Sequence, residues 1–121
     1  MRQQSRGRVN AIQFGWLLAG ACCWATATAA TMTVNTLADE LNSNGNCSLR
    51  EALRAANTTI LIDACPLGST SVTDVVVLQS GARYTLTRVG EDDIGVFGDL
   101  DIADDVILLG NGATIDGNGA V

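Results

Sequence analysis

One short segment of the chain places hydrophobic residues at the spacing of an amphipathic helix. Ser48 is followed three residues later by Glu51, and this capping-box pattern marks the start of a helix. We therefore predict a helix that begins after Ser48 and ends near Asn57, with Arg50 and Glu51 on its solvated face. The residues of its hydrophobic stripe are Leu49, Ala52, Leu53 and Ala56.

Most of the remaining chain has the pattern of short strands. β-branched and aliphatic runs alternate with turns rich in Gly, Asn and Asp. The turns do not repeat the two-residue type that a series of hairpins needs. The strands predicted in this way cover 31–37, 58–62, 75–79, 83–87, 99–102, 106–110 and 113–117.

The spacing of these strands favours a solenoid, in which each turn of chain stacks on the one before. Val77 and Ile102 are separated by 102 − 77 = 25 residues, within the solenoid repeat length of about 20 to 50 residues. The lone helix would cover the open end of the core, and a fragment of a small β-sandwich is the alternative fold. The predicted inward pairs are Leu100/Ile102, Val106/Leu108, Ala113/Ile115, Val75/Val77 and Tyr84/Leu86.

The first part of the chain has the layout of a secretory signal peptide. Three arginines precede a mostly apolar run from residue 9 to residue 30, and Ala27-Thr28-Ala29 offers a small-x-small cleavage site. We predict a signal peptide over 1–30 and one mature domain over 31–121, with no membrane span after cleavage. An uncleaved membrane anchor is the alternative, since the apolar run is long enough to cross a bilayer.

Four cysteines divide between these two parts. Cys47 and Cys65 lie in the mature segment, where an even pair in an exported protein predicts a disulfide worth about 3 kcal/mol. Two buried free thiols are the alternative, and a zinc site falls short of four ligands because the chain has no histidine. Cys22 or Cys23 would anchor a lipoprotein, but the lipobox leucine stands one residue too early for Cys22.

Removal of the signal peptide makes the chain strongly acidic. The whole sequence has seven basic and thirteen acidic residues, and three of the arginines lie in the signal, which leaves 4 − 13 = −9. The mature part has no lysine or histidine, and its aromatic residues are Tyr84 and Phe97. Without a basic surface or a stacking platform, nucleic acid is excluded as a partner.

Several segments in order resemble a known family. They are "TVNTLADE", "NGNCSLREALRAANT", "DVVVLQSGARYTLT" and "GDLDIADDVILLGNGATIDGNG". Together they resemble the N-terminal region of bacterial CSLREA-domain proteins, from about Thr33 to Gly119. The resemblance implies an exported, surface-associated protein with a right-handed parallel β-helix, capped at its N-terminal end by the helix. It also implies that more rungs follow, so we expect a short family member or a truncated chain.

Acidic residues cluster in the second half of the mature chain, at 91–93, at Asp99 and Asp101, and at 104–105. Such loops suit Ca²⁺, which takes six to eight oxygen ligands, but Asp and Asn also form turns by bonding their own backbone. No spacing matches an EF-hand or the glycine-rich calcium nonapeptide. We expect no cofactor, with Ca²⁺ as the alternative.

The function that these observations favour is a non-catalytic structural or adhesive module, secreted or attached to the cell surface. A contact with the cell surface or with polysaccharide is the expected partner, and the sequence leaves the oligomeric state open. The alternative is the N-terminal part of a carbohydrate-active enzyme, in which Asp99 and Asp101 would act as paired carboxylates on one side of a strand. No catalytic, cofactor-binding or metal-binding residue is assigned, and the residues singled out are Cys47, Cys65, Ser48 and Glu51.

Overall fold

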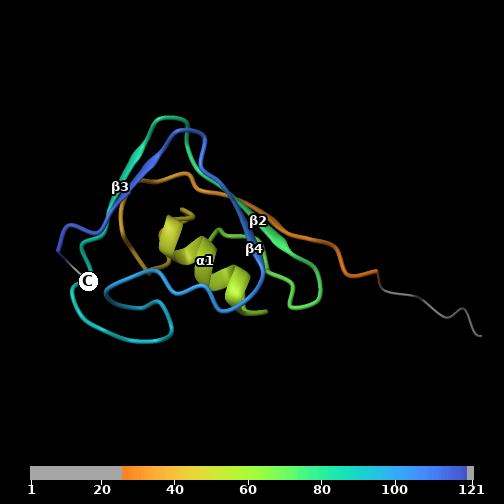
Figure 1. Ribbon diagram of the computed structural model, residues 1–121. Helices are drawn as coiled ribbons and strands as arrows, with labels where there is room; N and C mark the ends of the chain where they lie inside the picture. The colour runs from red at the N-terminus through yellow and green to blue at the C-terminus, as the bar shows by residue number, and fades with distance from the viewer. Residues whose placement is uncertain (1–25, 120–121) are drawn as a thin grey trace, which may run out of the picture.

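A computed structural model of the chain describes residues 26–119 (Figure 1). Most of the predicted signal peptide, and Cys22 and Cys23 with it, lies outside these residues. Within 26–119, no helix is long and apolar enough to cross a membrane. The elements in chain order are β1 (Thr31–Thr33), α1 (Leu49–Asn57), β2 (Asp74–Val77), β3 (Arg83–Thr85), β4 (Val106–Leu109) and β5 (Thr114–Asp116).

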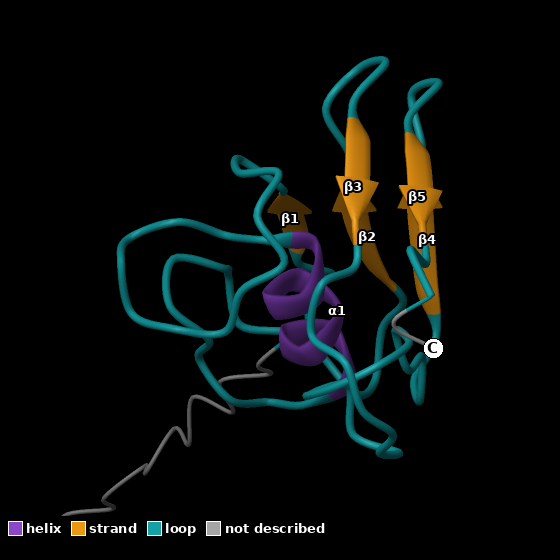
Figure 2. Cartoon of the chain, turned by 90° about the vertical axis from the view of Figure 1, so that its left-hand side faces the viewer, coloured by secondary structure: helices purple, strands orange, loops and turns teal. Residues whose placement is uncertain are grey.

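The strands form two small sheets, both parallel (Figure 2). One sheet has the order β1-β2-β4, and the other pairs β3 with β5. Met32, Val76 and Leu108 lie side by side across the first sheet, and Tyr84 lies beside Ile115 in the second. Parallel neighbours cannot be joined by a tight hairpin, so long connections carry the chain from one strand to the next.

The expectation of a right-handed parallel β-helix is wrong for the part of the chain that the structure describes. The two sheets are small and separate, and they form neither a closed sheet nor a solenoid. The strands have only three or four residues, and irregular loops connect them. The observed architecture is one helix packed against two small parallel sheets.

Two predicted strands are absent, each for a visible reason. The segment 58–62 forms a single bridge, between Ile62 and Cys65, and its neighbours Ile60 and Leu61 face the solvent. The segment 99–102 offers its carbonyl groups to side chains of the helix instead of to another strand. The four other strand predictions between 75 and 117, and the one at 31–37, overlap observed strands.

The inward-facing residues are only partly as predicted. Tyr84 and Leu86 are buried, whereas in β2 the buried positions are Asp74 and Val76 rather than Val75 and Val77. Among the other predicted inward residues, Leu100, Val106 and Ala113 are half-buried against the core. By contrast Ile102, Leu108 and Ile115 are exposed. The prediction fails in β2 because 75–77 is uniformly apolar and does not show which residues face inward. The structure turns Asp74 and Val76 inward.

Helix α1 lies inside the molecule rather than over one end of it. Figure 1 shows it surrounded by the strands and by the loop that joins β3 to β4. Seven of its nine residues are buried, and Arg50 and Glu51 are among them. The predicted solvated face for these two residues is therefore wrong, because loops cover the side of the helix that its hydrophobic stripe leaves free.

The loop between α1 and β2 passes unusually close to the helix at Gly68. A Cβ atom at this position would overlap the carbonyl oxygen of Ala55 and would lie 2.9 Å from the Cα atom of Ala56. Only a residue without a side chain fits at such a distance from a helix backbone. Gly68 thereby fixes how tightly this loop covers α1.

Candidate functional site

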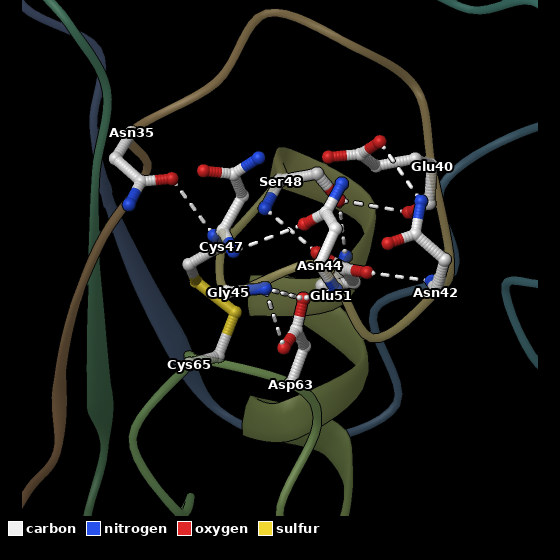
Figure 3. The surroundings of a disulfide bond; sticks show 11 residues. Asn35, Glu40, Asn42, Asn44, Gly45, Cys47, Ser48, Glu51, Asp63 and Cys65 are labelled. Carbon is white, nitrogen blue, oxygen red and sulfur yellow. Dashed lines mark hydrogen bonds between the residues drawn. A yellow bond between two sulfur atoms is a disulfide. The ribbon is translucent and has the colours of Figure 1, made fainter.

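The predicted disulfide between Cys47 and Cys65 is present and buried (Figure 3). It joins the residue before the helix cap to the turn at 62–65. Asn35 holds Cys47 from the other side: the Cys47 N–H donates to Asn35 Oδ1 at 2.8 Å, and the Cys47 carbonyl accepts from the Asn35 N–H at 3.0 Å. Cys47 thus ties the start of α1 to two other segments, to one by the disulfide and to the other by main-chain hydrogen bonds with Asn35.

The predicted capping box at Ser48 and Glu51 is also confirmed. Ser48 Oγ accepts from the Glu51 N–H at 3.1 Å, and Glu51 Oε2 accepts from the Ser48 N–H at 2.9 Å. Two further bonds reach outward, from Ser48 Oγ to the Glu40 carbonyl at 2.8 Å and from the Asn42 N–H to Glu51 Oε1 at 2.9 Å. The cap therefore folds the preceding loop onto the helix N-terminus as well as starting the helix.

Arg50 is buried, and all five of its N–H donors are used. Nε and Nη2 bind the two carboxylate oxygens of Asp39, at 2.5 Å and 3.1 Å. The remaining donors bind main-chain carbonyls of the loop between β3 and β4. These carbonyls belong to Gly98 at 2.8 Å, Asp99 at 2.9 Å and Gly95 at 3.3 Å.

Asp39 also binds the segment that directly follows β3. Its Oδ2 also accepts from the N–H groups of Thr87 and Arg88, at 2.7 Å and 3.0 Å. Burial raises the pKa of Asp39, but the bonds from Arg50, Thr87 and Arg88, with the charge of Arg50, lower it more, so the pKa lies below its ordinary value. Asp39 is ionised at neutral pH and paired with Arg50.

The loop between β3 and β4 has its own internal supports. The guanidinium carbon of Arg88 lies 5.1 Å from the centre of the Phe97 ring, and Arg88 Nε donates to the Val96 carbonyl at 2.7 Å. The carboxylate of Asp92 accepts from the N–H groups of Ile94, Val96 and Phe97. Slight burial raises the pKa of Asp92 and these bonds lower it, with a net lowering.

The acidic residues of this loop surround a depression of about 490 Å³. Asp99 and Asp101, which the sequence suggested as paired carboxylates, both line it, whereas Asp104 and Asp105 do not. Asp101 Oδ2 accepts from the Gly95 N–H at 2.7 Å, so this carboxylate also holds the loop. The other lining residues are Gly90, Glu91, Asp92 and Asp93.

Among residues 26–119, no group of three or more His, Cys, Asp or Glu side chains is placed to hold a metal ion. The comparisons with known proteins add no assignment: no protein-family model, no curated protein and no solved structure matches the chain. The interpretation of the site therefore depends on its geometry alone.

Sequence reasoning found the disulfide and the cap but missed the pairing of Arg50 with Asp39. An arginine in a short amphipathic helix is normally assigned to the solvent, because its neighbours in sequence do not show which loop will cover it. The one available signal was the polar loop directly before the capping box, since Asp39 lies in it.

Proposed function

We propose that the chain is a non-catalytic structural or adhesive module of an exported protein, related to the CSLREA domains that its sequence resembles. The observation that carries this proposal is how the buried polar side chains are used. Arg50 and the half-buried Asn57 bind main-chain groups of segments far away in the sequence, and Glu51 binds main-chain groups of the loop that precedes the helix. Side chains used in this way hold a fold together and are not free to act on a substrate.

Export is supported by the buried disulfide and by the sequence pattern of residues 1–30. Disulfides persist in oxidising compartments and are rare in the cytosol. The expected location is therefore the cell surface or the surrounding medium, in contact with surface polymers or polysaccharide.

The experiment is to produce the full chain in a bacterial host and to follow its location and its N-terminus. We expect a cleaved product at the surface or in the medium, in which alkylation without reductant labels neither Cys47 nor Cys65. Cells that display the chain should bind polysaccharide-coated surfaces more than cells that lack it. Uncleaved chain in the cytosol with both thiols labelled would contradict export, and a lipid-modified Cys22 or Cys23 would identify a lipoprotein.

A carbohydrate-active enzyme is the second candidate, and the acidic depression is the observation that favours it. Glycosidases use pairs of carboxylates that flank the scissile bond. The test is the release of reducing ends or unsaturated sugars from a panel of polysaccharides, with Asp99→Asn and Asp101→Asn as variants. Turnover that either variant abolishes would favour the enzyme, whereas binding without turnover favours the adhesive module.

A further inference from the structure

The loop that precedes the helix has the composition of a twelve-residue calcium loop. Such a loop carries oxygen ligands at positions 1, 3, 5 and 9, Gly at position 6 and Glu at position 12. The segment "ELNSNGNCSLRE", residues 40–51, departs from the strict pattern only at its first position, where Glu40 replaces Asp. The segment therefore misses the strict EF-hand pattern at one position and matches it at the others. The remaining positions are Asn42, Asn44, Gly45, Ser48 and Glu51.

The backbone of the segment also follows this arrangement. Gly45 has a φ of +85°, which is the left-handed conformation of a sharp turn. The helix begins at Leu49, the tenth position, directly after Ser48 as its cap. Asp63 fixes the turn from outside, because its carboxylate accepts from the N–H groups of Asn44 and Gly45.

The oxygen-bearing side chains lie close together (Figure 3). Glu40 Oε2 is 2.9 Å from Asn42 Nδ2, and Ser48 Oγ is 2.8 Å from the Glu40 carbonyl. The Glu51 carboxylate accepts from the N–H groups of Asn42 and Ser48, both at 2.9 Å. The first, third, ninth and twelfth positions thus share one hydrogen-bonded network at the helix N-terminus.

A separate observation concerns a carboxylate oxygen of this segment that has no hydrogen-bond partner. Glu40 Oε1 is buried without any hydrogen-bond donor, and it is the one such side-chain atom among residues 26–119. Glu51 is fully buried, and the ion pairs of the described residues involve Asp39 and Asp116 instead. A buried carboxylate oxygen that accepts no hydrogen bond is costly, and a bound cation would remove that cost.

We propose that residues 40–51 bind one Ca²⁺ ion. The carboxylates of Glu40 and Glu51 supply the charge, the amide oxygens of Asn42 and Asn44 supply neutral ligands, and Ser48 contributes directly or through water. The carbonyl of Asn46, at the seventh position, accepts from the Ala64 N–H at 3.2 Å and keeps a second lone pair. Mixed oxygen ligands on an irregular loop suit Ca²⁺ better than Mg²⁺, which demands a near-ideal octahedron.

The test is calorimetric titration of CaCl₂ into the exported, oxidised protein, together with thermal unfolding in CaCl₂ and in EDTA. We expect one site with a Kd of about 10⁻⁴ to 10⁻³ M, the range of extracellular modules, because only two ligands are charged. We expect saturating Ca²⁺ to raise Tm by about 5 °C. An equal rise with MgCl₂, or no heat and no rise with CaCl₂, would overturn the proposal.

Two variants and a control locate the site. Glu40→Gln keeps the shape of a side chain whose Oε1 has no partner, and it should weaken Ca²⁺ binding at least tenfold. Asn42→Asp adds a third carboxylate, so Tm should fall in EDTA and rise above that of the unmodified protein in CaCl₂. Glu91→Gln, in the acidic depression, is the matched control and should bind as before. Loss of binding in Glu91→Gln with retention in Glu40→Gln would assign the ion to the depression instead.

A different observation concerns Asp74, which is fully buried in β2. Its Oδ1 accepts from the Ala30 N–H at 2.8 Å, and its Oδ2 accepts from the Ser69 N–H at 2.7 Å. Neither of the two ion pairs found among residues 26–119 involves this carboxylate. The nitrogen that could become its positive partner is that of Ala30, since it follows the Ala27-Thr28-Ala29 cleavage pattern.

We infer that processing occurs after Ala29, one residue before the end of the predicted 1–30 signal peptide, and that it creates an ammonium group at Ala30 that pairs with Asp74. Hydrolysis adds one water across the Ala29–Ala30 bond and leaves a carboxylate on Ala29 and an α-ammonium on Ala30. The inference rests on the proposed export. The Ala30 carbonyl is already held by the Val75 N–H at 2.9 Å, so the new terminus stays beside the carboxylate.

Two measurements test the inference. The first is the intact mass of the exported protein, and the second is its Tm before and after acetylation of the α-amino group. We expect a chain that begins at Ala30, and a Tm that falls by about 5 °C on acetylation because a buried carboxylate loses its charged partner. In Asp74→Asn, acetylation should change Tm much less. Cleavage at another bond, or an unchanged Tm, would overturn the inference while leaving export intact; recovery of the chain only as an uncleaved cytosolic product would contradict export itself.

Discussion

Arg50 Nε lies 2.5 Å from Asp39 Oδ1, and both side chains are almost completely withdrawn from solvent. This pair joins the helix to the loop before it. Through Thr87 and the carbonyl of Gly98 it also joins the helix to the start and to the middle of the loop between β3 and β4. The position of α1 in the molecule therefore depends on one guanidinium group as well as on hydrophobic packing.

Replacement of Arg50 should destabilise the protein strongly. Arg50→Lys keeps the charge, but an ammonium group cannot reach Asp39 and three carbonyls at once, so we expect a loss of about 3 kcal/mol in the free energy of unfolding. Denaturant unfolding measures the loss. The matched control is Arg83→Lys, because Arg83 forms an exposed pair with Asp116 at 2.6 Å and should cost less than about 1 kcal/mol. Equal effects of the two variants would refute a special role for Arg50.

Stability should fall in acid partly because of Asp39. Its pKa in the folded protein lies below the ordinary value, so below about pH 4 the unfolded chain binds more protons than the folded one. The contribution of Asp39 is complete above that pH and is lost as the pH falls through the folded pKa. Thermal unfolding between pH 6 and pH 2 should show a shallower decline for Asp39→Asn, which starts from a lower Tm at neutral pH. Parallel curves for the two proteins would contradict this prediction.

Gly68→Ala should destabilise the protein by more than 2 kcal/mol, an overpacking effect. The added Cβ meets the backbone of α1 at Ala55, and neither the helix nor the loop can move without loss of contacts. Gly110→Ala is the control, since Gly110 has nothing within 4 Å of an added Cβ and no positive φ. Chemical denaturation of both variants measures the difference, and a neutral Gly68→Ala would show that the loop is looser than the structure indicates.

Removal of the disulfide should cost about 3 kcal/mol, the value for a closed loop of this length. The comparison is between the oxidised protein and the Cys47→Ala/Cys65→Ala double variant, which leaves no free thiol in the mature part. Because both sulfur atoms are buried, the native disulfide should also resist mild reductant until the protein unfolds. Rapid reduction under native conditions would show that the turn at 62–65 opens readily.

Local chemistry explains which predictions succeeded. The capping box of Ser48 and Glu51 and the end of the helix near Asn57 depend on groups only a few residues apart, so the sequence is sufficient to predict them. The disulfide followed from the number of cysteines in an exported segment. The strands at 75–79 and 83–87 were visible as β-branched runs. The calcium-loop spacing of residues 40–51 was equally visible but departs from the strict pattern at Glu40.

The sequence by itself therefore determined the helix, its cap, the disulfide and most of the strands. Only the tertiary structure decided that Arg50 and Glu51 are buried, that Asp74 replaces a hydrophobic residue in the inward row of β2, and that the strands form two small parallel sheets. The physical reason is the same for the three buried polar residues. A polar side chain can be buried only when other groups satisfy it, and the sequence pattern does not show which loops the fold will bring over that side chain.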